Sequence, residues 1–131
     1  MKGLVLSAKW EPRSGYRLSE FERETGKAIE GAQVWRHPVL EIKEVPTPKA
    51  GPGQLVLKVK ACGVCGSDVH FYETDDEGYI LYPGLTKFPV IIGHEFAGEV
   101  VELGSGPETA NFKVGDRVTC EEMVWCGHCR P

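Results

Sequence analysis

Short hydrophobic segments, separated by glycine and proline, run along the whole chain and indicate strands rather than helices. The clearest alternation covers residues 55–61, where one face of a strand would carry Leu55, Leu57, Val59 and Ala61. Residues 4–8, 90–92 and 96–103 also predict strands. Residues 34–45 predict a strand pair or a bulged edge strand, because Pro38 cannot donate a ladder hydrogen bond. The pattern therefore predicts a mainly β fold, a barrel or a sandwich.

Three polar stretches interrupt these strands. Residues 11–31 have no clean period, and they predict a surface excursion with one helical turn near residues 18–24. Residues 75–87 predict a long loop in which polar and aromatic residues are interleaved. Residues 112–119 predict two short β segments around a turn at Gly115 and Asp116. No long amphipathic helix is expected, and the residues after Cys65 lack a clear helical pattern.

The composition argues against several classes of partner. With 131 residues, of which 41% are hydrophobic and 26% charged, the chain is long enough for one domain with a hydrophobic core. The formal net charge of −4 argues against a nucleic-acid partner, which needs a basic surface. No apolar run approaches the roughly 20 residues that span a bilayer, and residues 1–6 do not resemble a secretory signal. We therefore expect a cytoplasmic protein that binds neither nucleic acid nor membrane.

The cysteines indicate a metal site. There are five of them, at positions 62, 65, 120, 126 and 129. An odd number at close spacing, without a secretory signal, fits metal ligation better than a set of disulfides. Cys120 is expected to pack against its neighbours rather than to bind a metal.

The strongest chemical signal lies in residues 62–70 together with residues 93–95. Cysteine, histidine and carboxylates bind zinc, and an open catalytic zinc site uses three such ligands. We expect Cys65 at the end of one strand and His94 at the start of the next, with Asp68 or Glu95 completing or orienting the ligand set. A structural cysteine and an unrelated core histidine are the better interpretation of either residue alone, but not of the combination.

Two other motifs are incomplete. A zinc-protease motif would need a second histidine four residues after His94, but position 98 is glycine. A dinucleotide-binding fingerprint over residues 104–109 would need glycine in place of Thr109 and a following helix, so these residues predict a β-turn.

Cys126 and Cys129 have the spacing of half a structural zinc site, and its other half is absent from the chain. The alternative for this pair is an exposed or redox-active C-x-x-C.

Four motifs together resemble the zinc-dependent medium-chain alcohol/polyol dehydrogenases, namely residues 63–70, 93–98, 114–118 and 126–129. Their order and approximate spacing are similar to those of the family. Within the family, residues 35–36, 74–85 and 121–131 are most similar to an enzyme that oxidises an inosose, which is a cyclitol.

The resemblance implies a GroES-like β-barrel catalytic domain over residues 34–131, truncated in its structural-zinc lobe. Residues 1–33 would form an N-terminal strand and the polar excursion. In the family a Rossmann domain follows, which this chain is expected to lack. Two further structural cysteines, and a ligand of the catalytic zinc in many members, would also follow Pro131. Residues 1–131 alone are therefore expected to be inactive.

The resemblance also implies the ligands of two zinc ions. Cys65 and His94 match ligands of the catalytic zinc, and Glu95 matches a carboxylate that binds zinc directly in some polyol dehydrogenases. Cys126 and Cys129 match the first two of four cysteines around a structural zinc. Cys62 matches no ligand position, and it is expected in the core.

The remaining candidate residues would serve the proton and the cofactor. Asp68 matches the acid that orients a zinc ligand. Ser67 matches the hydroxyl that contacts the substrate oxygen, and His70 the end of the proton relay. The cofactor, NAD or NADP, would contact Gly66, Ser67 and His70.

The expected reaction is the oxidation of a secondary alcohol, a polyol or a cyclitol, by a full-length enzyme that forms a homo-oligomer. One alternative is a non-enzymatic GroES-like binding module with a zinc-stabilised lobe. A second is a redox protein that uses Cys62 and Cys65. Such a protein would need a helix N-terminus beside its thiols to lower their pKa.

Overall fold

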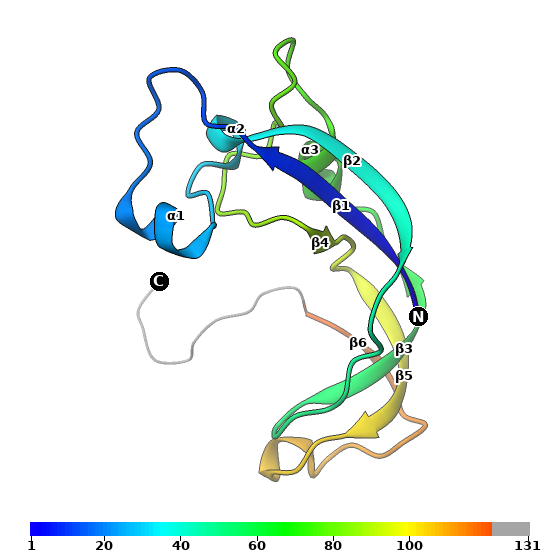
Figure 1. Ribbon diagram of the computed structural model, residues 1–131. Helices are drawn as coiled ribbons and strands as arrows, with labels where there is room; N and C mark the ends of the chain where they lie inside the picture. Colours follow the sequence, from blue (N-terminus) through cyan, green and yellow to red (C-terminus); the bar gives the residue numbers. More distant parts are fainter. Residues whose placement is uncertain (122–131) are drawn as a thin grey trace. The chain divides into compact units, whose positions relative to one another are not determined.

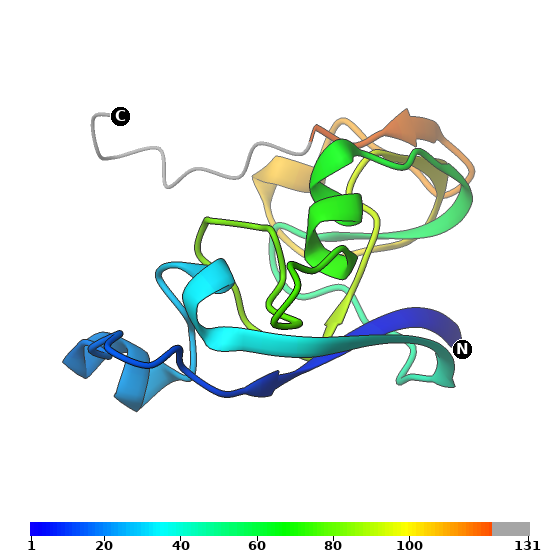
Figure 2. The ribbon, with the colours of Figure 1, turned by 90° about the horizontal axis from the view of Figure 1, so that it is seen from above.

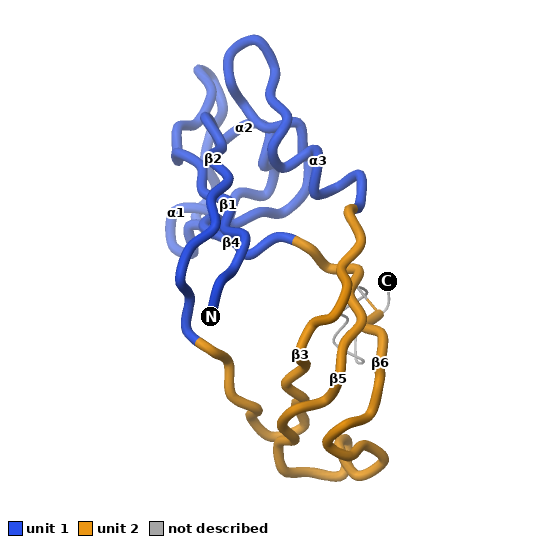
Figure 3. The backbone as a smooth tube through the Cα atoms, turned by 90° about the vertical axis from the view of Figure 1, so that its right-hand side faces the viewer, with its two compact units in different colours: residues 1–46, 65–92 blue, residues 47–64, 93–131 orange. Residues whose placement is uncertain are grey.

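The computed structural model describes residues 1–121, and it confirms the mainly β class. Its chain divides into two compact units, each of which contains a three-stranded antiparallel sheet (Figure 3). Unit 1 comprises residues 1–46 and 65–92, and unit 2 comprises residues 47–64 together with the chain from residue 93 onward. The predicted boundary between residues 33 and 34 stays a prediction. Among the described residues, no helix is long and apolar enough to cross a membrane.

The sheet of unit 1 has the order β2-β1-β4, with β1 at its centre (Figure 1). Its strands are β1 (Lys2–Trp10), β2 (Trp35–Glu44) and β4 (Val90–Ile91). Strands β1 and β2 run side by side (Figure 2), and their long ladder shifts its register between Ser7 and Lys9. The shift lies opposite His37 and Pro38, where β2 has one residue more than β1. This confirms the bulged edge strand, because a bulge tolerates a proline without an N–H group.

The predicted surface excursion and the predicted long loop both contribute to the core of unit 1. Its buried hydrophobic cluster contains Leu6, Ala28, Val34, Trp35, Ile80 and Phe88. The Trp35 ring meets Trp10 and Phe88 edge-on, with centroid distances of 4.9 and 5.0 Å. Ala28 belongs to the excursion and Ile80 to the long loop, so both segments pack inward at these points. The prediction of a purely surface excursion is wrong in this respect.

The excursion contains two short helices, α1 (Glu20–Thr25) and α2 (Gly31–Val34). The predicted helical turn corresponds to α1. Ser19 and Glu22 form a capping box at its start, and Gly26 ends it in the left-handed conformation with φ 63°. Both signals are local, which explains why this helix was predictable.

The sheet of unit 2 has the order β3-β5-β6. Its strands are β3 (Leu55–Cys62), β5 (Phe96–Leu103) and β6 (Arg117–Thr119), and a short 3-10 helix, η1, covers Pro107–Thr109. Val100 of β5 is fully buried. The predicted β segment at residues 112–114 is wrong, because these residues form no strand. Up to residue 121, only β6 follows the Gly115 turn.

Candidate metal and catalytic site

A short helix that the sequence pattern did not reveal carries most of the candidate residues of unit 1. This helix, α3 (Gly66–Tyr72), has Cys65 at its N-cap position. A carboxylate oxygen of Asp68 accepts a hydrogen bond of 3.1 Å from the backbone N–H of Cys65. Asp68 thus stabilises the first turn of the helix and fixes the backbone at Cys65. The prediction that Cys65 ends a strand is wrong, because β3 ends at Cys62 and Cys65 is the N-cap residue of α3.

The exposure of these side chains differs along the helix. Asp68 is only 5% exposed, Cys65 and Ser67 are half-buried, and His70 is exposed. Ser67 and His70 are three residues apart in α3, so they lie along one side of the helix. This spacing is compatible with the predicted relay from a half-buried hydroxyl to an exposed imidazole.

His94 and Glu95 lie in unit 2, directly before β5. Strand β5 begins at Phe96, so the prediction that His94 starts this strand is wrong by two residues. His94 is half-buried and Glu95 is exposed. The carbonyl oxygen of Glu95 accepts a hydrogen bond of 2.7 Å from the N–H of Gly63, which extends the β3–β5 pairing past Cys62.

Gly63 makes room for the Glu95 side chain. A Cβ atom at position 63 would lie 2.6 Å from Oε2 of Glu95 and 3.3 Å from its Cβ. Real Cβ contacts are essentially never shorter than 3.0 Å, so a side chain at position 63 would displace the carboxylate. The sequence interpretation missed this role of Gly63, and the available signal was the presence of this glycine within residues 62–70.

The peptide chain itself links the two groups of candidate ligands. Cys65 follows Gly63 by two residues, so their Cα atoms are at most about 7 Å apart in any arrangement of the units. The N–H of Gly63 in turn bonds to the backbone of Glu95. The backbone of Glu95 is therefore hydrogen-bonded two residues before Cys65 in the chain.

The chemistry of the donor set fits zinc. Cys65 offers a sulfur atom, His94 an imidazole nitrogen and Glu95 a carboxylate oxygen. These are the three atom types that bind zinc in proteins, and three protein ligands leave a position open for a substrate.

The other cysteines differ from expectation or lie outside the described part of the chain. Cys62 and Cys120 are exposed free thiols, so the predictions that Cys62 lies in the core and that Cys120 packs are wrong. Cys126 and Cys129, the predicted ligands of a structural zinc, lie outside the described residues. Because α3 starts beside Cys65, the absence of a helix can no longer be used against a redox role.

Comparison with known proteins points to dehydrogenases. The model of the family described as alcohol dehydrogenase GroES-like domain matches residues 51–131. Scyllo-inosose 3-dehydrogenase from Thermotoga maritima is 51% identical over 138 aligned residues, which cover 100% of this chain and 34% of that protein. L-Threonine 3-dehydrogenase from Salmonella newport is 41% identical over 104 residues, which cover 79% of this chain and 26% of that protein. The chain thus spans about a third or less of these relatives.

Solved structures agree with this result. A Thermotoga maritima protein, provisionally described as an alcohol dehydrogenase, has a TM-score of 0.89 and 50% sequence identity, and the match covers 99% of this chain and 34% of that one. The 2R,3R-butanediol dehydrogenase from Bacillus subtilis has a TM-score of 0.50 and 32% identity over 88% of this chain and 27% of that one. The predicted resemblance, including the similarity to an inosose-oxidising enzyme, is confirmed.

Proposed function

Because this chain belongs to the family of alcohol dehydrogenase GroES-like domains, we propose that it carries the zinc-binding catalytic region of an NAD- or NADP-dependent dehydrogenase. The substrate would be a secondary alcohol, and more narrowly a polyol or a cyclitol such as an inosose. The observation that carries the proposal is the 51% sequence identity with scyllo-inosose 3-dehydrogenase, over an alignment that covers 100% of this chain. We expect activity when this region is joined to a nucleotide-binding domain, and none from residues 1–131 alone.

The catalytic zinc would be held by Cys65, His94 and Glu95, whose donor atoms fit the metal. When bound, it would supply Lewis-acid polarisation of the substrate oxygen. Asp68 would hold Cys65 in position, as its hydrogen bond to the Cys65 N–H suggests. A structural zinc at Cys126 and Cys129 is part of the same proposal.

The proton of the alcohol would pass through residues of α3. Ser67, which is half-buried, would accept the proton at its Oγ atom and pass its own hydroxyl proton on toward His70. His70, which is exposed on the same side of the helix, would release it to solvent. Gly66, Ser67 and His70 would also contact the NAD or NADP that accepts the hydride. A cytoplasmic location, a homo-oligomeric full-length enzyme and the lack of nucleic-acid or membrane partners stay predictions.

The test measures metal content and activity in the complete gene product that contains this chain. Cobalt(II) in place of zinc gives a thiolate charge-transfer band that reports on a cysteine ligand. Cys65→Ser should abolish the band of the catalytic site and the activity, and His94→Ala should abolish the activity and lower the metal content. Cys62→Ser is the matched control, because Cys62 is an exposed free thiol three residues away and matches no ligand position.

The proposal is wrong if Cys65→Ser and His94→Ala both keep the metal content and activity of the wild type. A wild-type protein that binds zinc but oxidises no secondary alcohol would instead favour the non-enzymatic binding module.

A further inference from the structure

The long loop of unit 1 returns to the helix from which it starts. Residues 73–82 follow α3 directly, and the N–H of Leu81 lies 3.1 Å from the carbonyl oxygens of both His70 and Glu73. The Tyr82 ring packs on Phe71 of α3 with a centroid distance of 4.3 Å. The base of the loop is therefore attached to the helix that carries Ser67, Asp68 and His70.

The tip of the same loop is attached to the start of β2. The N–H of His37 donates to the carbonyl oxygen of Gly78 over 2.8 Å, and Arg36 pairs with Tyr79 in an antiparallel bridge. The Arg36 Nε donates to the carbonyl oxygen of Glu77 over 2.6 Å. His37 adopts a φ of 55°, a strained value for a residue other than glycine. Such strain persists where the surrounding contacts hold the backbone firmly.

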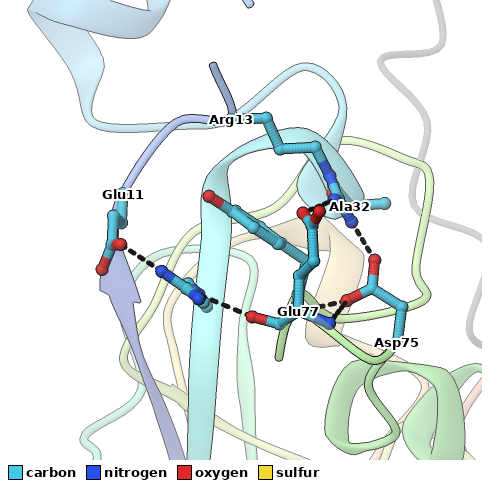
Figure 4. A network of polar contacts seen from close by, with 7 residues as sticks. Glu11, Arg13, Ala32, Asp75 and Glu77 are labelled. Atoms are coloured by element: carbon cyan, nitrogen blue, oxygen red, sulfur yellow. Dashed lines mark hydrogen bonds and ion pairs between the residues drawn. The ribbon is translucent and has the colours of Figure 1, made fainter.

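Arg13, from the polar excursion, closes this arrangement (Figure 4). Its guanidinium carbon lies 3.9 Å from the centroid of the Tyr79 ring, and that of Arg36 lies 5.2 Å from the same centroid. Arg13 also forms ion pairs with Asp75 and, over 2.6 Å, with Glu77. Its Nε donates to the carbonyl oxygen of Ala32, which fixes the arginine to helix α2.

Asp75 connects the Arg13 guanidinium to the backbone of the loop. One carboxylate oxygen pairs with Arg13, and the other accepts hydrogen bonds of 3.0 Å from the N–H groups of Glu77 and Tyr79. Tyr79 is only 5% exposed, so its side chain is buried when the loop is folded. Arg13 therefore binds both the ring and the carboxylate that shape the tip of the loop.

We propose that Arg13 is a positioning residue that latches the loop of residues 73–82 and, through it, sets how the enzyme binds polyhydroxylated substrates. This inference rests on the proposed function, in which α3 carries the proton relay, and it adds that the loop, whose base is attached to α3, lines one side of the substrate pocket. It also assigns a role to the excursion of residues 11–31. This excursion would hold the loop of residues 73–82 in place without contributing a catalytic residue.

The first measurement is structural and does not depend on activity. Arg13→Ala in the full-length protein should raise the amide hydrogen-exchange rates of Tyr79 and Leu81 about tenfold or more, because the loop tip loses its charged and aromatic contacts. The exchange rate of Leu6, at the centre of the β1 ladder, should not change. Arg17→Ala is the matched control, because Arg17 is an exposed arginine of the same excursion.

The second measurement separates binding from chemistry. Arg13→Ala should raise the KM for a cyclitol about tenfold with a smaller change in kcat, and it should leave the KM for a short secondary alcohol unchanged, because a short alcohol offers no further hydroxyl to the loop. Arg13→Lys should restore part of the loss, since lysine keeps the charge but not the planar stacking.

Each outcome decides a different part of the inference. Unchanged exchange rates at Tyr79 and Leu81 would overturn the latch. Faster exchange with an unchanged cyclitol KM would overturn its link to specificity. A wild-type enzyme without activity on either alcohol would refute the proposed function and with it the specificity role, while the exchange rates would still decide whether Arg13 latches the loop.

Discussion

The carboxylate of Glu95 occupies the space that a side chain at Gly63 would need. The hypothetical Cβ of residue 63 lies 2.6 Å from Oε2 of Glu95, and the two residues are joined by a backbone hydrogen bond of 2.7 Å. A glycine outside the ligand set therefore leaves room for a candidate ligand in its present position.

Gly63→Ala should weaken zinc binding at the catalytic site by about 10- to 100-fold, which is typical when a residue that supports a ligand is changed. The added methyl group would push the Glu95 carboxylate away from its present position. Competition with a chromogenic chelator measures the affinity. Gly66→Ala is the control for zinc binding only, because a Cβ at position 66 meets no atom within 4 Å. Equal zinc affinity in both variants would contradict the role of Gly63.

Gly104→Ala should destabilise unit 2 by about 3 kcal/mol, because the two backbones approach too closely for any side chain. A Cβ at position 104 would lie 1.7 Å from the carbonyl oxygen of Gly51, and a backbone atom cannot move aside as a flexible side chain can. Urea denaturation with a probe in unit 2 measures the change. A loss below about 0.5 kcal/mol, the usual range for a neutral surface change, would show that the loop relaxes freely.

Glu22→Ala should cost about 3 kcal/mol of folding free energy, because it leaves several buried donors without an acceptor. Glu22 is 1% exposed, and its carboxylate accepts hydrogen bonds from Tyr16 Oη at 2.9 Å and from the N–H of Ile29 at 3.0 Å. Both groups of Ser19, the N–H and the hydroxyl, also donate to it, over 2.8 and 2.9 Å. Glu20→Ala, an exposed change in the same helix, should cost less than about 0.5 kcal/mol. Similar denaturation midpoints for the two variants would refute the prediction.

The carboxylates of Glu22 and Asp75 make the free energy of unfolding depend on pH in the acidic range. Burial alone would raise the pKa of Glu22, but its hydrogen bonds outweigh burial and hold the pKa below 4.5. Burial likewise opposes the Arg13 and backbone hydrogen bonds of Asp75, which together hold its pKa below 3.8. Both groups therefore stabilise the fold fully above their ordinary pKa values, and this contribution is lost as the pH falls below about 4.

At the alkaline end Tyr16 has the opposite effect. Burial, followed by the hydrogen bond to Glu22, raises the pKa of Tyr16 from 10.0 to about 12. Its contribution is complete below pH 10 and is lost as the pH rises from 10 toward 12. The free energy of unfolding, measured from pH 3 to 12, should thus be flat in the middle and fall at both ends. Tyr16→Phe should remove the part of the fall in unfolding free energy above pH 10 that comes from Tyr16. The same slope above pH 10 in this variant and in the wild type would argue against this role of Tyr16.

Local patterns predicted the strands and one helix because they describe residues that are close in the chain. The alternation of residues 55–61 and the proline within residues 34–45 correctly indicated β3 and the bulged β2. The capping box of Ser19 and Glu22, with Gly26 seven residues after Ser19, is a local signal of α1. Helix α3 was missed because its N-cap is a cysteine, which is not among the usual N-cap residues, and because it is only 7 residues long.

The sequence by itself determined the mainly β class, the family, and the candidate ligands Cys65, His94 and Glu95, because a metal site needs particular side chains in a recognisable order. Only the tertiary structure decided which distant groups meet. The pairing of Arg13 with Tyr79, the space for Glu95 above Gly63 and the inward packing of Ala28 all depend on how separate segments fold onto one another. No local period records such contacts, since they arise from the packing of the whole unit rather than from neighbours along the chain.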